Sequence, residues 1–195
     1  FKLPGYIYAT VLSEKIFGFN ETGVRFPSAF FGVLTVLAFY YLVKNILERN
    51  EKKEVIYGLW LPPVTALLLA INPWHINFSR AAFEANGSLF FIVLGGLFLV
   101  KSTHKSWYLL LAAASFATSV YFYYTARILA PMLLLINFFA FKKHVFKSKK
   151  WVMLSILFGI LLLAPLIPNM FREGQSRISQ VSIFEDSTLT DPYLA

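Results

Sequence analysis

The sequence predicts an all-α protein, a polytopic bundle of about six transmembrane helices that follows an N-terminal interfacial helix. Composition is the first observation behind this fold class, because 57% of the 195 residues are hydrophobic and only 14% are charged. Soluble domains carry about 25% charged residues. The second observation is that the mean hydropathy of +0.62 comes from long apolar runs separated by short polar connectors. A chain of this kind is an integral membrane protein in contact with membrane lipids.

The first expected element is a helix over Lys2 to Phe17. Polar and charged residues such as Glu14 interrupt this stretch, and it is too short to cross about 30 Å of hydrocarbon. Its tyrosines and mixed charge favour a helix that lies along the membrane interface. Gly18 then acts as the C-terminal cap. Residues 1–23 are therefore expected to form an interfacial helix and an external segment.

Six apolar runs within residues 24–168 predict the transmembrane spans. They are Phe26 to Val43, Val55 to Ile71, Ala85 to Val100, Trp107 to Tyr121, Thr125 to Phe141 and Trp151 to Ile167. Pro27 suits the first turn of the first span. Pro62 and Pro63 fall inside the second span, and we expect them to kink it. Residues 169–195 are expected to begin an external loop.

Basic residues set the expected orientation. The connectors Lys44 to Glu54, Lys101 to Lys105 and Lys142 to Lys150 hold eleven of the 18 lysines and arginines. They alternate along the chain, as loops on one side of a membrane do, and the positive-inside rule places them in the cytoplasm. The net charge of +8 therefore reflects topology, and no nucleic-acid partner is expected.

The candidate site is the polar stretch NPWHINFSRAAFEAN, from Asn72 to Asn86, which separates two long apolar runs and is expected to face outward. Its central pair is Arg80 with Glu84. Ionisable residues near spans are often functional, yet a spacing of four residues also fits a plain helical salt bridge. His75 stands beside a tryptophan and is more typical of an interfacial histidine than of a ligand.

Three arginines, Arg25, Arg80 and Arg127, fall at the external ends of different spans. A lone arginine in such a place usually extends its side chain to the interface. Three on one side would instead suit a phosphate or pyrophosphate, through bidentate charge-assisted hydrogen bonds. Both interpretations stay open. The chain has no cysteine and no carboxylate and histidine set that marks a metal site, so no cofactor is certain and a divalent metal is left open.

Four stretches of the sequence resemble glycosyltransferase family 39, the relatives of protein O-mannosyltransferases and of the aminoarabinose transferase that acts on lipid A. They read FGFNETGVRFPSAFFGVLTVLAFYYLV, INPWHINFSRAAFEAN, YFYYTARILAPMLLL and QSRISQVSIFED, in the order that the family has them. The resemblance implies the multi-spanning fold called GT-C. It also implies a polyprenyl-phosphate-linked sugar as donor, with a lipid, glycan or protein as acceptor.

The resemblance also suggests roles for single residues. In the family the general base is usually an aspartate just ahead of the segment that here begins at Lys2, so the chain is expected to be an internal fragment that lacks this base. Glu84 falls where many members carry a second acidic residue, which implies a supporting acidic or metal-linked role. Phosphate binding is expected for Arg80 and Arg127, and framing of the loop for Lys2 and Arg25. The full set of substrate-binding candidates is Arg80, Arg127, Lys2, Arg25, His75 and Tyr124.

The sequence therefore predicts a membrane glycosyltransferase of a bacterial or archaeal plasma membrane, with its site facing outward. The expected reaction is an inverting displacement at the anomeric carbon. Two other classes of function stay open. A transporter or flippase of lipid-linked sugars would hold the phosphate with the same arginines, and a non-catalytic membrane subunit would need no site.

Overall fold

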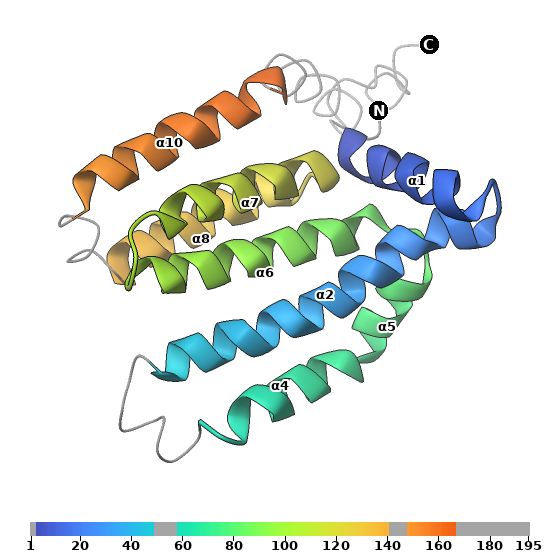
Figure 1. Cartoon of the computed structure of the whole chain (residues 1–195), viewed down its shortest axis with the longest axis horizontal. Helices are drawn as coiled ribbons and strands as arrows, with labels where there is room; N and C mark the ends of the chain where they lie inside the picture. Colours follow the sequence, from blue (N-terminus) through green and yellow to red (C-terminus); the bar gives the residue numbers. More distant parts are fainter. Residues whose placement is uncertain (1–2, 49–57, 141–147, 167–195) are drawn as a thin grey trace, which may run out of the picture. The chain divides into compact units, whose positions relative to one another are not determined.

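The computed structural model describes residues 3–48, 58–140 and 148–166, and within these ranges helices joined by short turns account for the fold, with no strand. The chain divides into two compact units, residues 1–162 and 163–195. Of the second unit, only the end of the last helix and a 3₁₀ turn, Ala164–Leu166, are described. The helices are α1 (Pro4–Phe17), α2 (Glu21–Glu48), α4 (Leu61–Ala70), α5 (Pro73–Arg80), α6 (Glu84–Ser102), α7 (Tyr108–Phe122), α8 (Ala126–Ala140) and α10 (Lys149–Leu163) (Figure 1).

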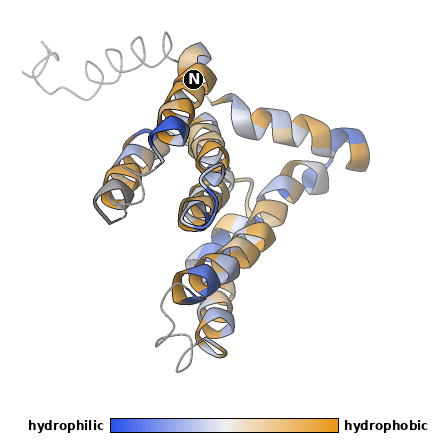
Figure 2. Ribbon diagram, turned by 60° about the vertical axis from the view of Figure 1, so that its left-hand side comes forward, coloured by the Kyte–Doolittle hydropathy of each residue, from blue (hydrophilic) through white to orange (hydrophobic). Residues whose placement is uncertain are grey.

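The predicted fold class, a helical membrane bundle, is confirmed. In the described part of the chain, α2, α6 and the run Lys149–Leu166 are long and apolar enough to cross a membrane, at 18 residues or more. The apolar helices α4 and α7 and the apolar part of α8 are shorter. Figure 2 shows hydrophobic residues along most of these helices. Six complete crossings remain a prediction.

Two expectations about prolines are wrong. Pro27 lies inside α2, because that helix begins at Glu21, well before Phe26. The earlier start follows from Asn20, whose side-chain oxygen accepts a hydrogen bond from the N–H of Gly23 at 2.8 Å and so caps the helix. Pro62 and its neighbour do not kink a span. They lie in the first turn of α4, where a missing N–H costs nothing because first-turn N–H groups have no partner within the helix.

The first helix forms where it was expected. α1 ends at Gly18, whose φ of 82° is a left-handed conformation that suits glycine. Consequently no continuous helix runs from α1 into α2, and the two helices run in different directions (Figure 1). α1 packs against α2, where Tyr6 donates a hydrogen bond to the carbonyl of Val24 at 2.9 Å.

α6 lies at the centre of unit 1, between α2 and α7. The buried core joins Leu99 of α6, Ala112 and Phe116 of α7, and Ala130 of α8. Gly95 lets α6 and α7 approach closely, because a Cβ at this position would stand 2.9 Å from the ring of Phe116. Small residues at helix contacts are the usual means of packing helices tightly in membranes.

The basic connectors attach at one end of these helices. The C-terminal ends of α2 and α6 and the start of α10 lie at the same end in Figure 1, whereas α5 and the turn between α7 and α8 lie at the other. This grouping agrees with the expectation that the connectors share one side of the membrane. Which side is cytoplasmic remains a prediction.

Candidate functional site

The polar stretch between the apolar runs contains a short helix that the sequence did not predict. α5 begins at Pro73, where proline needs no partner for an N–H. The side chain of Asn72 caps it by accepting hydrogen bonds from the N–H groups of Trp74 at 2.9 Å and His75 at 3.4 Å. The helix then ends at Arg80. The stretch is therefore an ordered element and not an open loop.

Arg80 and Glu84 do not lie on one helix. Arg80 is the last residue of α5 and Glu84 the first of α6, and the extended backbone of Ala81, with ψ of 155°, separates them. Within the described ranges no ion pair joins the two side chains; the ion pairs found there are both within α2. The interpretation of this pair as a plain helical salt bridge is therefore wrong.

Buried hydrogen bonds hold α5 against α2. Ser28 of α2 donates through its hydroxyl to the carbonyl of Phe78 at 2.7 Å. Nε2 of His75 lies 3.2 Å from the carbonyl oxygen of Gly32. Because a carbonyl only accepts, this ring nitrogen carries the proton. His75 is 8% exposed, so it is a buried contact with the backbone of α2 and not an interfacial histidine.

Asn86, in the first turn of α6, ties the same region together. Its amide nitrogen donates to the carbonyl of Ser28 at 2.6 Å and to the hydroxyl of Ser79 at 3.3 Å. Ser79 in turn donates to the carbonyl of His75 at 2.7 Å. A Cβ at Gly32 would collide with the Ser79 hydroxyl, which shows how closely α5 approaches α2. The position of α5, and so of Arg80, is fixed by these contacts.

A cleft of about 580 Å³ lies between α2, the end of α4 and α5. Its lining consists of Glu21, Thr22, Arg25, Phe26, Ala29, Gly32, Val33, Val36, Ala70, His75, Ile76, Ser79 and Arg80. The charged residues come from the first turns of α2 and the last turn of α5. The apolar lining continues along α2 to Val36, so that the α2 residues of the cleft extend over roughly 22 Å at a helical rise of about 1.5 Å per residue.

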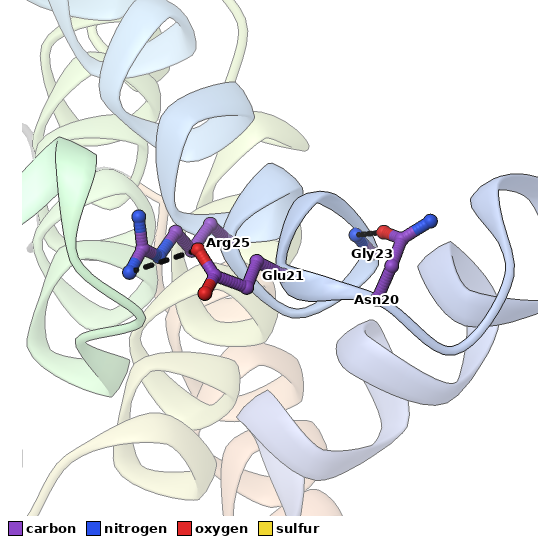
Figure 3. A network of polar contacts seen from close by, with 4 residues as sticks. All are labelled: Asn20, Glu21, Gly23 and Arg25. Atoms are coloured by element: carbon purple, nitrogen blue, oxygen red, sulfur yellow. Dashed lines mark hydrogen bonds and ion pairs between the residues drawn. The ribbon is translucent and has the colours of Figure 1, made fainter.

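The cleft contains an ion pair. A guanidinium nitrogen of Arg25 lies 3.4 Å from a carboxylate oxygen of Glu21, one turn earlier on α2 (Figure 3). Both side chains are exposed, at 59% and 83%. Among the described residues, none forms an ion pair with Arg80. Two guanidinium groups beside an apolar wall can bind a ligand that has an anionic group and a hydrocarbon part.

The structure does not bring all the predicted site residues together. The cleft gathers Arg25, Arg80 and His75. Arg127 lies in the first turn of α8 and over the ring of Tyr124, 4.5 Å from its centroid. Neither residue lines the cleft. Glu84 also lies outside the lining, in the first turn of α6, where a carboxylate complements the helix dipole.

Lys2 falls outside the described residues, as does the QSRISQVSIFED stretch. Within residues 3–48, 58–140 and 148–166, no group of three or more histidines and carboxylates is placed to hold a metal ion. The carboxylate that does line the cleft, Glu21, stands near Arg25 in the sequence but was given no role in the predicted site. Glu21 and Arg25 are four residues apart, which is typical of an ordinary ion pair on a helix. Glu21 becomes part of the cleft only because α5 packs beside this part of α2.

The fold defines a class, a polytopic helical membrane protein, and its cleft combines two arginines and a glutamate with an apolar wall. A family model described as dolichyl-phosphate-mannose-protein mannosyltransferase matches residues 2–168. The chain belongs to this family, whose members are membrane glycosyltransferases of the GT-C type, and the resemblance inferred from the sequence is confirmed. Comparison with curated proteins and with solved structures finds no match.

Proposed function

We propose that the protein transfers a sugar from a polyprenyl-phosphate-linked donor to an acceptor hydroxyl on the outer face of the membrane. In this proposal Arg25 and Arg80 bind the donor phosphate. Membership of the mannosyltransferase family supports the reaction class. The observation that carries the donor class is the cleft, which combines two guanidinium groups with a long apolar wall.

The apolar wall favours a lipid-linked donor over a water-soluble one. Phe26 and Val33 line the cleft and are 40% and 63% exposed, so hydrocarbon in the bilayer has direct access to them. Moving a prenyl chain out of hydrocarbon costs about 0.8 kcal/mol for each CH₂ group. A lipid donor is therefore expected to keep its chain against such a wall while its phosphate reaches the arginines.

The reaction is a displacement at the anomeric carbon. The acceptor oxygen forms a bond to that carbon as the bond from the carbon to the phosphate oxygen breaks, and a single displacement inverts the configuration. The electron pair of the broken bond stays on the phosphate, whose added negative charge Arg25 and Arg80 stabilise. The acceptor proton passes to a general base, which the resemblance expects ahead of Lys2. Glu84, the first residue of α6, is proposed to have a supporting acidic role.

The first prediction tests Arg80 as a phosphate ligand. Arg80→Ala removes a charge-assisted hydrogen bond that contributes about 1.5–3 kcal/mol. Since about 1.4 kcal/mol corresponds to a tenfold change, we expect sugar transfer to become roughly ten- to a hundredfold less efficient. The measurement is transfer from a polyprenyl-phosphate sugar by purified protein in nanodiscs, with the yield of folded protein determined alongside.

Two companion variants make this result specific. Arg80→Lys keeps the charge but loses the planar fork that binds phosphate through two hydrogen bonds, and we expect it to restore only part of the activity. Lys105→Ala removes an exposed charge in the turn between α6 and α7, away from the cleft, and should leave transfer unchanged. Normal transfer in Arg80→Ala would reject the proposed site. Donor binding without any transferred product would instead favour a flippase or transporter.

A further inference from the structure

Glu21 places a negative charge in a cleft that is proposed to bind phosphate. Its carboxylate lines the cleft beside Arg25 and Arg80 and lies 3.4 Å from the Arg25 guanidinium. The charged arginine and glutamate side chains in the lining are therefore two cations and one anion. Figure 3 shows Glu21 and Arg25 extending side by side from α2.

Glu21 is the first residue of α2, where a carboxylate complements the helix dipole, as Glu84 does on α6. Its ion pair with Arg25 adds little to this, because exposed pairs spaced four residues apart contribute little to stability. A second such pair on α2, Lys44 with Glu48 at 3.8 Å, lies at the other end of the helix. That pair is chemically similar but lines no part of the cleft. What distinguishes Glu21 is its position beside the proposed phosphate site.

The charge on the phosphate changes during the proposed reaction. The donor is a phosphodiester and carries one negative charge. When the bond from the sugar to the phosphate oxygen breaks, the electron pair remains on a phosphomonoester, which carries close to two negative charges at neutral pH. Two arginines alone would therefore bind the product more tightly than the donor, and turnover would slow. A carboxylate nearby repels a dianion twice as strongly as a monoanion, and it also competes for Arg25.

We propose that Glu21 is a specificity-determining residue that weakens binding of the dianionic product relative to the monoanionic donor, and so speeds product release. The inference rests on the proposed function, because it assumes that Arg25 and Arg80 bind the donor phosphate. It adds that the cleft distinguishes the two charge states of one lipid phosphate.

The test compares two probes with the same hydrocarbon chain, farnesyl phosphate and its methyl phosphodiester. Their affinities for the full chain in uncharged-lipid nanodiscs are measured for wild type and for Glu21→Gln. At a separation of about 6 Å in a water-like dielectric, removal of the carboxylate should tighten diester binding roughly threefold and monoester binding roughly tenfold. Glu21→Asp keeps the charge and should preserve the wild-type ratio. Glu48→Gln, the matched pair on the same helix, should change neither affinity.

The outcomes separate this inference from the proposed function. An equal change for both probes, or no change, in Glu21→Gln would overturn the role of Glu21. In that case a loss of binding of both probes in Arg80→Ala would leave the proposed phosphate site standing. If wild type binds neither probe, or if Arg80→Ala leaves both affinities unaltered, the proposed function itself fails and the inference fails with it. In transfer assays, Glu21→Gln should slow steady-state turnover while a single turnover keeps its rate.

Discussion

At the scale of the residue, Gly32 determines how closely α5 can lie against α2. Its carbonyl oxygen is 3.2 Å from Nε2 of His75, and the space a side chain would need is filled by Ser79. Asn86, which is 1% exposed, bonds both Ser28 and Ser79 across the same contact. Arg80 lies in the cleft because these residues fix the helix that carries it.

Gly32→Ala should therefore push α5 away from α2. The added methyl collides with the Ser79 hydroxyl, and overpacking of this kind costs about 1–3 kcal/mol. We expect a lower unfolding free energy in detergent and weaker donor binding. Gly96→Ala is the matched control, because its Cβ would meet only Leu42, at an ordinary 3.8 Å. Equal stability of the two variants would show that the contact at Gly32 does not position α5.

At the scale of the element, α1 is attached to α2 by one specific polar contact. Tyr6 is 8% exposed and donates to the carbonyl of Val24. Burial raises the pKa of Tyr6 above its ordinary value of 10.0, and this effect outweighs the lowering that comes from the neighbouring Ser28. The folded chain thus favours the neutral phenol.

Tyr6→Phe should lower the unfolding free energy by about 0.5–1.5 kcal/mol, the net contribution of one hydrogen bond. The pH dependence has a definite sign, because a raised pKa in the fold gives stability that is complete below the ordinary value and lost as pH rises through the folded value. Wild type should therefore lose stability in alkali beyond what Tyr6→Phe loses. Tyr8→Phe serves as the control, since Tyr8 is 70% exposed. Identical alkaline profiles for wild type and Tyr6→Phe would contradict this account.

The sequence predicted the helices that contain long apolar runs. It did not predict the helix whose formation depends on tertiary contacts. α6 and α7 were placed within about two residues, because burial in lipid requires a continuous apolar run. α5 was missed because an eight-residue polar helix has little stability alone, and buried bonds to α2 and α6 supply it. The cleft depends on that helix, so the sequence assigned site roles to Arg25 and Arg80 but none to Glu21, which pairs with Arg25.

At the scale of the whole molecule, the distribution of charge predicts the orientation in the membrane. Basic residues gather in connectors that attach at one end of the helices in unit 1, and the cleft arginines lie on elements of the other end. From this grouping the positive-inside rule predicts that the cleft faces outward.

Cysteine labelling tests this orientation, because the natural chain has no cysteine. A cysteine replacing the exposed Asn77 of α5 should react with a membrane-impermeant thiol reagent in intact cells. A cysteine replacing the exposed Lys105, in the turn between α6 and α7, should react only after the membrane is made permeable. Labelling of the second site from outside would reverse the orientation.

The central claim is that a lipid phosphate occupies the cleft between α2 and α5. Its most direct test is photo-crosslinking with a polyprenyl phosphate sugar that carries a photoreactive group on its prenyl chain, followed by mass-spectrometric mapping of the modified residues. We expect modification of the apolar wall around Val33 and Val36, suppressed by excess unlabelled donor and strongly reduced in Arg80→Ala. Modification confined to the exposed faces of α8 and α10, unaffected by competitor and by the substitution, would contradict the claim.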